Sequence, residues 1–176
     1  HPFTGRAFNG YVHCRRRRFY YYYLSTYPGR YQIIMILQFL LAMVATSSFA
    51  VLYGVPKNQF VYSSLTGALG WISYLFFCKL GAGIVFASLF ASFFLTIVSR
   101  LFASIRKNPV TLYLVTGIFT LVPGAGIYYT SYYFIMNNMN QFAAKGMETF
   151  KIAGAISIGI IFGFSIPQRL FQLKKH

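Results

Sequence analysis

The chain has 176 residues, of which 57% are hydrophobic, 20% aromatic and only 10% charged. Its charges are unbalanced, since 16 lysines and arginines face a single acid, Glu148, for a net charge of +15. Soluble domains carry about 25% charged residues, so this chain has too little polar surface for a water-soluble globule. It is too apolar for a disordered tail, and its bases form short clusters rather than the hydrated basic face of a nucleic-acid binder. These features predict a protein that lies in membrane lipid and binds no nucleic acid.

Five apolar stretches are each long enough to cross a membrane, because about 20 apolar residues in a helix span the ~30 Å hydrocarbon core. The predicted spans are residues 33–53, 60–78, 81–103, 110–136 and 152–171. The polar run 137–151 is expected to be the last connection. The bilayer core offers no water to backbone groups, and the alternation typical of membrane barrels is absent, so the spans must be helices. The predicted fold is an all-α, polytopic membrane bundle of about five transmembrane helices.

Residues 1–34 differ from the rest of the chain. They contain the runs Arg15–Arg18 and Tyr20–Tyr23, and they lack the apolar region and cleavage site of a signal peptide. With five spans, the bases divide 9 to 7 between the two sides when this segment is counted, and 3 to 7 without it. The second count predicts a cytoplasmic C-terminus. The segment is therefore either a non-native extension before Met35 or a basic arm on anionic headgroups.

The predicted organisation has three parts. Residues 1–34 form the basic and aromatic extension, residues 35–173 the transmembrane domain, and residues 174–176 a basic cytoplasmic tail. The membrane is expected to be a bacterial inner or plasma membrane.

Small residues recur along several spans at spacings that favour close helix packing. Lipid provides no hydrophobic drive between helices, so membrane helices associate through small residues that let their backbones approach. Two interpretations stay open: the small residues pack one compact bundle, or one stripe docks another polypeptide, including a second copy of the chain. The residues predicted to pack helices are Gly67, Gly70, Ala87, Ala91, Gly159 and Gly163.

The fourth span contains a helix-breaking sequence, Leu121-Val122-Pro123-Gly124-Ala125-Gly126, near its middle. Proline cannot donate a backbone hydrogen bond, and each glycine lowers helix propensity by about 1 kcal/mol, so we expect a break at Pro123-Gly124, about halfway through the bilayer. If a second half-helix starts at Pro123, its free amides and positive dipole end suit a carboxylate. The alternative is a packing kink without a ligand. The candidate substrate contacts here are Pro123, Gly124, Gly126 and Tyr128.

Arg100 is the second candidate for binding a substrate, because it lies inside the third apolar stretch. Its side chain either extends to the headgroups or faces the bundle and pairs with a substrate carboxylate. No Asp, Glu or His occurs within the spans, and Cys14 and Cys78 have no metal-ligand neighbours at suitable spacing. We therefore expect no enzymatic activity, no metal and no cofactor, since one glutamate cannot supply acid–base or metal chemistry.

Several short motifs, in order along the spans, resemble those of the threonine/serine exporter (ThrE) family. They are Phe49-x4-Gly54-Val55-Pro56, Gly67-Ala68-Leu69-Gly70-Trp71, Ser99-Arg100, Leu121-Val122-Pro123-Gly124 with Tyr128, Gly154-Ala155-x-Ser157-Ile158-Gly159 and Ser165-Ile166-Pro167. The resemblance covers about residues 35–173, and it is to the small split membrane subunit of the family.

The resemblance implies a component of a secondary transporter that acts with a second membrane subunit carrying the other half. Family members export threonine and serine, and some split pairs are linked to succinate or related dicarboxylates. Both substrate classes carry a carboxylate, which agrees with a broken helix and an arginine. The competing interpretation is a membrane scaffold or assembly subunit that transports nothing.

Overall fold

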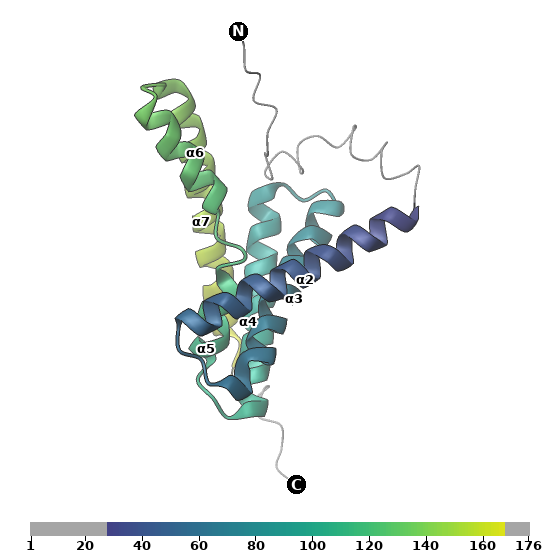
Figure 1. Cartoon of the computed structure of the whole chain (residues 1–176). Coiled ribbons are helices and arrows are strands. Elements are labelled where there is room, and N and C mark those ends of the chain that lie inside the picture. The colour runs from purple at the N-terminus through teal and green to yellow at the C-terminus, as the bar shows by residue number, and fades with distance from the viewer. Residues whose placement is uncertain (1–27, 168–176) are drawn as a thin grey trace.

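A computed structural model describes residues 28–167 and shows a helical chain with short connections (Figure 1). Residues 1–27 and 168–176, which hold most of the N-terminal extension and the whole basic tail, lie outside the described residues. In the described part there are no strands, which confirms the prediction of an all-α protein. The elements are α2 (Pro28–Leu52), the 3-10 helix η2 (Lys57–Gln59), α3 (Phe60–Lys79), α4 (Ile84–Arg106), α5 (Val110–Ile118), α6 (Gly124–Ile135) and α7 (Met139–Ser165).

Four of these helical segments are long and apolar enough to cross a membrane, namely 35–52, 57–79, 84–106 and 139–165. The fourth predicted span is instead divided between α5, with 9 residues, and α6, with 12. At a rise of about 1.5 Å per residue, neither half alone crosses ~30 Å of hydrocarbon. The predicted break at Pro123-Gly124 is therefore present, and the helical membrane bundle is confirmed.

The predicted connection over residues 137–151 was wrong, because α7 already begins at Met139. The side chain of Asn138 caps this helix by accepting a hydrogen bond from the amide of Gln141 at 3.3 Å. Polarity alone predicted a loop, but these polar residues belong to α7 and most of them are exposed at the protein surface. At its other end α7 stops at Ser165, before the predicted limit of 171. The predicted domain boundary after residue 34 falls inside α2.

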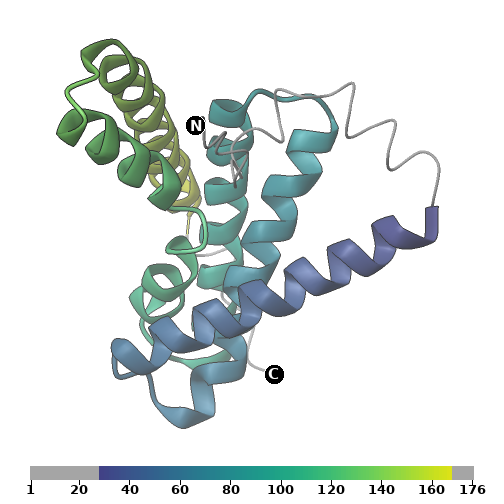
Figure 2. The ribbon, with the colours of Figure 1, turned by 45° about the horizontal axis from the view of Figure 1, so that its top comes forward.

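The described helices form a bundle from which one helical hairpin projects. Helix α4 lies at the centre and packs against α3, α5 and the C-terminal half of α7, while α2 covers α3 (Figures 1 and 2). Helix α6 leads away from the bundle, and the N-terminal half of α7 folds back along it. We call α6 and residues 139–151 of α7 the hairpin. The broken fourth segment thus connects the bundle to the hairpin.

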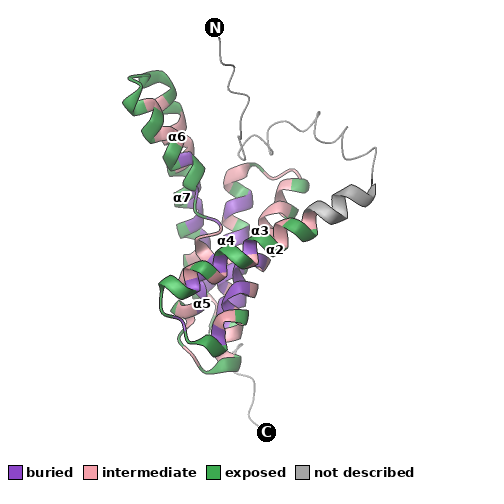
Figure 3. Ribbon diagram, in the orientation of Figure 1, coloured by how far each residue is buried: buried purple, intermediate pink, exposed green. Residues whose placement is uncertain are grey.

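Burial follows this division. Buried residues concentrate on α3, α4 and α5, whereas most of the hairpin is exposed (Figure 3). Half of the α4 span is buried inside the protein, against 17% of the α2 span. Large apolar side chains such as Leu41, Val44 and Ile161 face outward, as expected for helices in contact with lipid. The apolar core consists of Ala91, Leu95, Leu114, Leu121, Ile152 and Ile156.

Candidate functional site

Glycines allow α7 to lie directly against α4. A Cβ atom at Gly159 would overlap the side chain of Ser92 and the backbone of Leu89, and one at Gly163 would meet Thr96 at 2.6 Å. Because residue numbers rise together on both sides of this contact, α4 and α7 run parallel. Close approach of this kind increases van der Waals contact, which is the main attraction between helices in lipid.

The other predicted packing residues also lie at helix contacts. A side chain at Gly67 would overlap Thr46 of α2, and one at Gly70 would meet Leu95 of α4 at 2.5 Å. Ala87 and Ala91 of α4 are completely buried. The small residues named from the sequence therefore lie between helices of one bundle.

The break in the fourth segment covers residues 119–123, from the end of α5 to the start of α6, and it finishes in a tight turn centred on Pro123. Its φ of −75° and ψ of 58° are those of an inverse γ-turn, and the Gly124 amide donates to the Val122 carbonyl at 2.7 Å. Helix α6 then begins with a bond of 3.0 Å from the Ile127 amide to the Pro123 carbonyl. No side chain caps α6. Within residues 28–167, no acceptor faces the amides of Ala125 and Gly126.

The candidate residues on α6 point in different directions. Gly124 is exposed and has open space where a side chain would be, while Gly126 is buried against Thr149 of α7. Tyr128 is 64% exposed and stacks on Tyr132 at a ring-centroid distance of 6.5 Å. Gly124 and Tyr128 are thus accessible from outside, whereas Gly126 serves the contact between α6 and α7.

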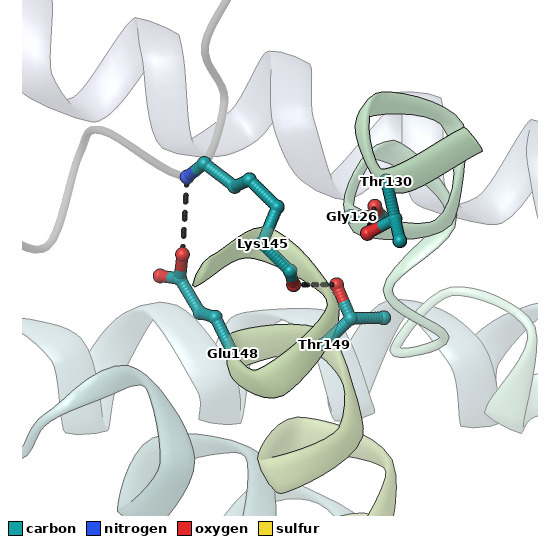
Figure 4. A network of polar contacts seen from close by, with 5 residues as sticks. All are labelled: Gly126, Thr130, Lys145, Glu148 and Thr149. Atoms are coloured by element: carbon teal, nitrogen blue, oxygen red, sulfur yellow. Dashed lines mark hydrogen bonds and ion pairs between the residues drawn. The ribbon is translucent and has the colours of Figure 1, made fainter. Parts of the chain in front are cut away.

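The polar contacts near Gly126 each stay within one helix of the hairpin (Figure 4). Thr130 donates to the Gly126 carbonyl at 2.7 Å, and Thr149 donates to the Lys145 carbonyl at 2.8 Å. Lys145 and Glu148 form an ion pair of 3.0 Å on α7. Glu148 is the only acid in the chain, so this ion pair uses its only carboxylate side chain.

The sequence predicted a break about halfway through the bilayer, but in the structure the break does not lie level with the middle of α4. Since Gly159 of α7 is level with Ser92 of α4, the start of α4 at Ile84 is about level with Lys151. Gly126 contacts Thr149, which lies beyond that point. The first turn of α6 is therefore near the N-terminal end of α4, because α5 and the turn have already carried the chain there.

Arg100 points into the bundle rather than toward the headgroups. Its side chain is 4% exposed, and Nη1 donates to the carbonyls of Gly163 at 2.7 Å and Phe164 at 3.2 Å. These carbonyls belong to the last turn of α7, where the helix dipole is negative and no intrahelical donors remain. The guanidinium also lies 5.8 Å from the ring centroid of Phe164. In this arrangement Arg100 holds the end of α7 against α4.

The two candidate carboxylate contacts are far apart. Gly126 contacts α7 at Thr149, whereas Arg100 contacts it at Gly163. These 14 positions correspond to about 21 Å along a straight helix. A serine or succinate molecule cannot bridge that distance, so the structure does not bring Arg100 and the break into one site.

A family model described as "Threonine/Serine exporter, ThrE" matches residues 38–166. The chain belongs to the threonine/serine exporter family. This family is one of transporters, and with the apolar helices it makes this exporter-family chain a multi-pass membrane protein. No curated protein and no solved structure matches the chain in the corresponding comparisons.

Sequence reasoning missed one polar cluster of this exporter-family chain. The hydroxyl of Tyr113 donates to Oε1 of Gln59 at 2.7 Å, and Nε of Arg106 donates to the same oxygen at 3.3 Å. Asn108 donates from Nδ2 to the Tyr113 oxygen at 3.4 Å. Gln59 and Tyr113 are 54 positions apart, and no local spacing signals the contact.

Proposed function

We propose that this chain is one membrane subunit of a secondary transporter that exports small carboxylate-bearing metabolites, either threonine and serine or a succinate-like dicarboxylate. The observation that carries this proposal is the family match over residues 38–166. A second membrane subunit is proposed to supply the other half of the path. The only acid within the four candidate spans is Glu148 on α7, where it forms an ion pair with Lys145.

The first turn of α6 is the proposed contact for the substrate carboxylate. It offers two amides without acceptors in the described part of the chain, at Ala125 and Gly126, and Ala125 is exposed. Helix N-termini favour anions because free N–H groups and the positive dipole end coincide there. Arg100 is a weaker candidate in this conformation, since its guanidinium already donates to the carbonyls of Gly163 and Phe164. Tyr128 stands on the next turn of α6.

The hairpin is the proposed contact for the second subunit. Among the described helices, α6 packs closely only against α7. Its outer surface exposes Ile127, Tyr128 and Ile135, the last with 77% of its surface open. At the base of the hairpin, Lys151 is level with the N-terminal end of α4. Residues 139–151 of α7 therefore extend about 18 Å past that end of α4. Apolar side chains beyond the bundle need a cover, and a membrane protein partner provides one.

Counterflow in proteoliposomes tests the transport proposal. Vesicles hold the chain alone, the candidate second subunit alone, or both, and each is loaded in turn with serine, threonine and succinate. We expect exchange of the labelled substrate only when both subunits are present. If the two together exchange none of the three, the chain acts as a scaffold or assembly subunit instead.

A single backbone amide can be deleted to test the site. Ala125→Pro removes one donor at a position in the first helical turn, where proline is tolerated. We expect counterflow to fall by about tenfold, the value of one hydrogen bond to a charged group. Gly124→Ala is the matched control, because it keeps every amide and meets nothing within 4 Å. If both variants reach the membrane at equal levels and transport equally, the substrate carboxylate does not bind the first turn of α6.

A bacterial inner or plasma membrane with the C-terminus in the cytoplasm is the proposed location. The support is the excess of bases on the C-terminal side when residues 1–34 are left out. Reporter fusions at the C-terminus, one active only in the cytoplasm and one only outside, measure the orientation directly.

A further inference from the structure

Two connections between helices meet at the end of the bundle opposite the hairpin. The α2–α3 connection, with Lys57, and the α4–α5 connection, with Arg106 and Lys107, lie together there (Figure 1). The buried side chain of Gln59 links them, because its oxygen accepts from both Arg106 and Tyr113. Asn108 adds a bond of 3.1 Å to the Arg106 carbonyl.

This network holds the guanidinium of Arg106 in one place. Nε donates to Gln59, and the guanidinium carbon lies 4.6 Å from the ring centroid of Tyr62. A planar group held on one edge and one face keeps its other two nitrogens for a further acceptor. Within residues 28–167, neither Nη atom of Arg106 has an acceptor, and the residue is exposed. The donors that match an oxyanion are thus already oriented outward.

The surroundings of Arg106 are basic. Lys107, in the left-handed conformation at φ 52°, and Lys57 are both exposed. The single acid of the chain, Glu148, is engaged by Lys145 on the hairpin at the other end of the molecule. Three exposed cations at this end therefore lack a carboxylate side chain from their own chain, and their counter-charge must come from outside.

The depth of the cluster identifies the source of that charge. Helix α4 has 23 residues, or about 34 Å, which is close to the hydrocarbon thickness plus one turn. Arg106 is its last residue, so the cluster lies at the level of the lipid headgroups. Anionic lipid phosphates are concentrated there, and arginine binds phosphate oxygens through two parallel hydrogen bonds.

We propose that Arg106, Lys107 and Lys57 bind the phosphate of an anionic lipid headgroup, with Gln59 as the residue that positions Arg106. The ligand class is a phosphodiester in the plane of the membrane, and the bound lipid ties the α2–α3 and α4–α5 connections together. This site is separate from the proposed substrate contact on α6 and does not depend on which metabolite is exported.

Native mass spectrometry of the purified full chain tests the site with two probes, phosphatidylglycerol and phosphatidylcholine. We expect phosphatidylglycerol to be retained preferentially. Arg106→Gln should lower its retention by about tenfold, as one charge-assisted bond is worth. Gln59→Leu should lower it less, because Arg106 remains but is no longer held. The matched control Lys151→Gln removes an exposed base at the opposite end and should leave retention unchanged.

Three outcomes would overturn the proposal. One is equal retention of the two lipids by the unmodified chain. Another is retention by Arg106→Gln at the level of Lys151→Gln, in samples whose thermal unfolding shows that both variants are folded. The third is displacement of phosphatidylglycerol by millimolar succinate or inorganic phosphate, which would assign the site to a free anion rather than to a lipid.

Discussion

The α4–α7 contact and the hairpin use the same device with different results. In both, a glycine faces the hydroxyl side chain of a neighbouring helix: Gly159 faces Ser92, and Gly126 faces Thr149. The first pair lies inside the bundle, where α4 is covered by three helices, and the second lies in a pair of helices that is otherwise open. A close-packing glycine therefore marks a helix contact, but only its surroundings decide whether that contact supports the whole fold or one projecting element.

The largest expected effect is at the bundle contact. Gly159→Ala would overlap the Leu89 backbone as well as Ser92, so α7 must shift, and we expect a loss of about 3 kcal/mol in the free energy of unfolding. Gly154→Ala on the same helix meets nothing within 4 Å and should be neutral or stabilising by up to about 1 kcal/mol. Thermal unfolding in detergent measures both. Equal melting temperatures would mean that α4 and α7 are not closely packed.

Arg100 provides the second test of the bundle contact. Arg100→Leu leaves the Gly163 and Phe164 carbonyls without their buried donor, and we expect a loss of about 2 kcal/mol. Arg100→Lys should recover part of it, because the ammonium group still donates. The same melting experiment decides between this structural role and substrate binding. If an Arg100 variant melts normally but no longer transports, Arg100 binds substrate rather than stabilising the bundle.

A substitution at the contact between α6 and α7 should lower stability less than one at the bundle contact, and a second substitution should restore the loss. Gly126→Ala brings a methyl group against Thr149 Oγ1 at 2.5 Å, and the obstacle is a side chain rather than backbone. We expect a loss of about 1 kcal/mol that Thr149→Ala restores in the double variant. Cross-linking of cysteines placed on α6 and α7 reports whether the hairpin has opened. Failure of the second substitution to rescue the first would show that the two residues do not touch.

The smallest effect belongs to the ion pair between Lys145 and Glu148. Their side chains are 28% and 40% exposed, so solvent screens the attraction, and Glu148→Gln should change stability by less than about 0.5 kcal/mol in detergent. Repeating the measurement with the second subunit bound makes the test sharper. A much larger effect there would indicate that the partner covers the hairpin, whereas an unchanged small effect would place the contact elsewhere.

Local features of the sequence were sufficient to predict the fold class and the interrupted fourth segment of this protein. Hydropathy and the low share of charged residues determine a helical membrane protein, and Pro123 with its neighbouring glycines predicts the interruption between α5 and α6. Short motifs, which are also local, resemble the family that the match over residues 38–166 shows. Each of these properties depends on the backbone preferences and solvation of residues close together in the chain.

Only the tertiary structure decided what those local features contact. The partners of Arg100 are 63 and 64 positions away, and Gln59 meets Tyr113 across 54 positions. The separation of about 21 Å between Arg100 and the first turn of α6 likewise follows from how α7 lies against α4 and α6. Such registers depend on the fit of whole helix surfaces, which spacing along one segment does not encode.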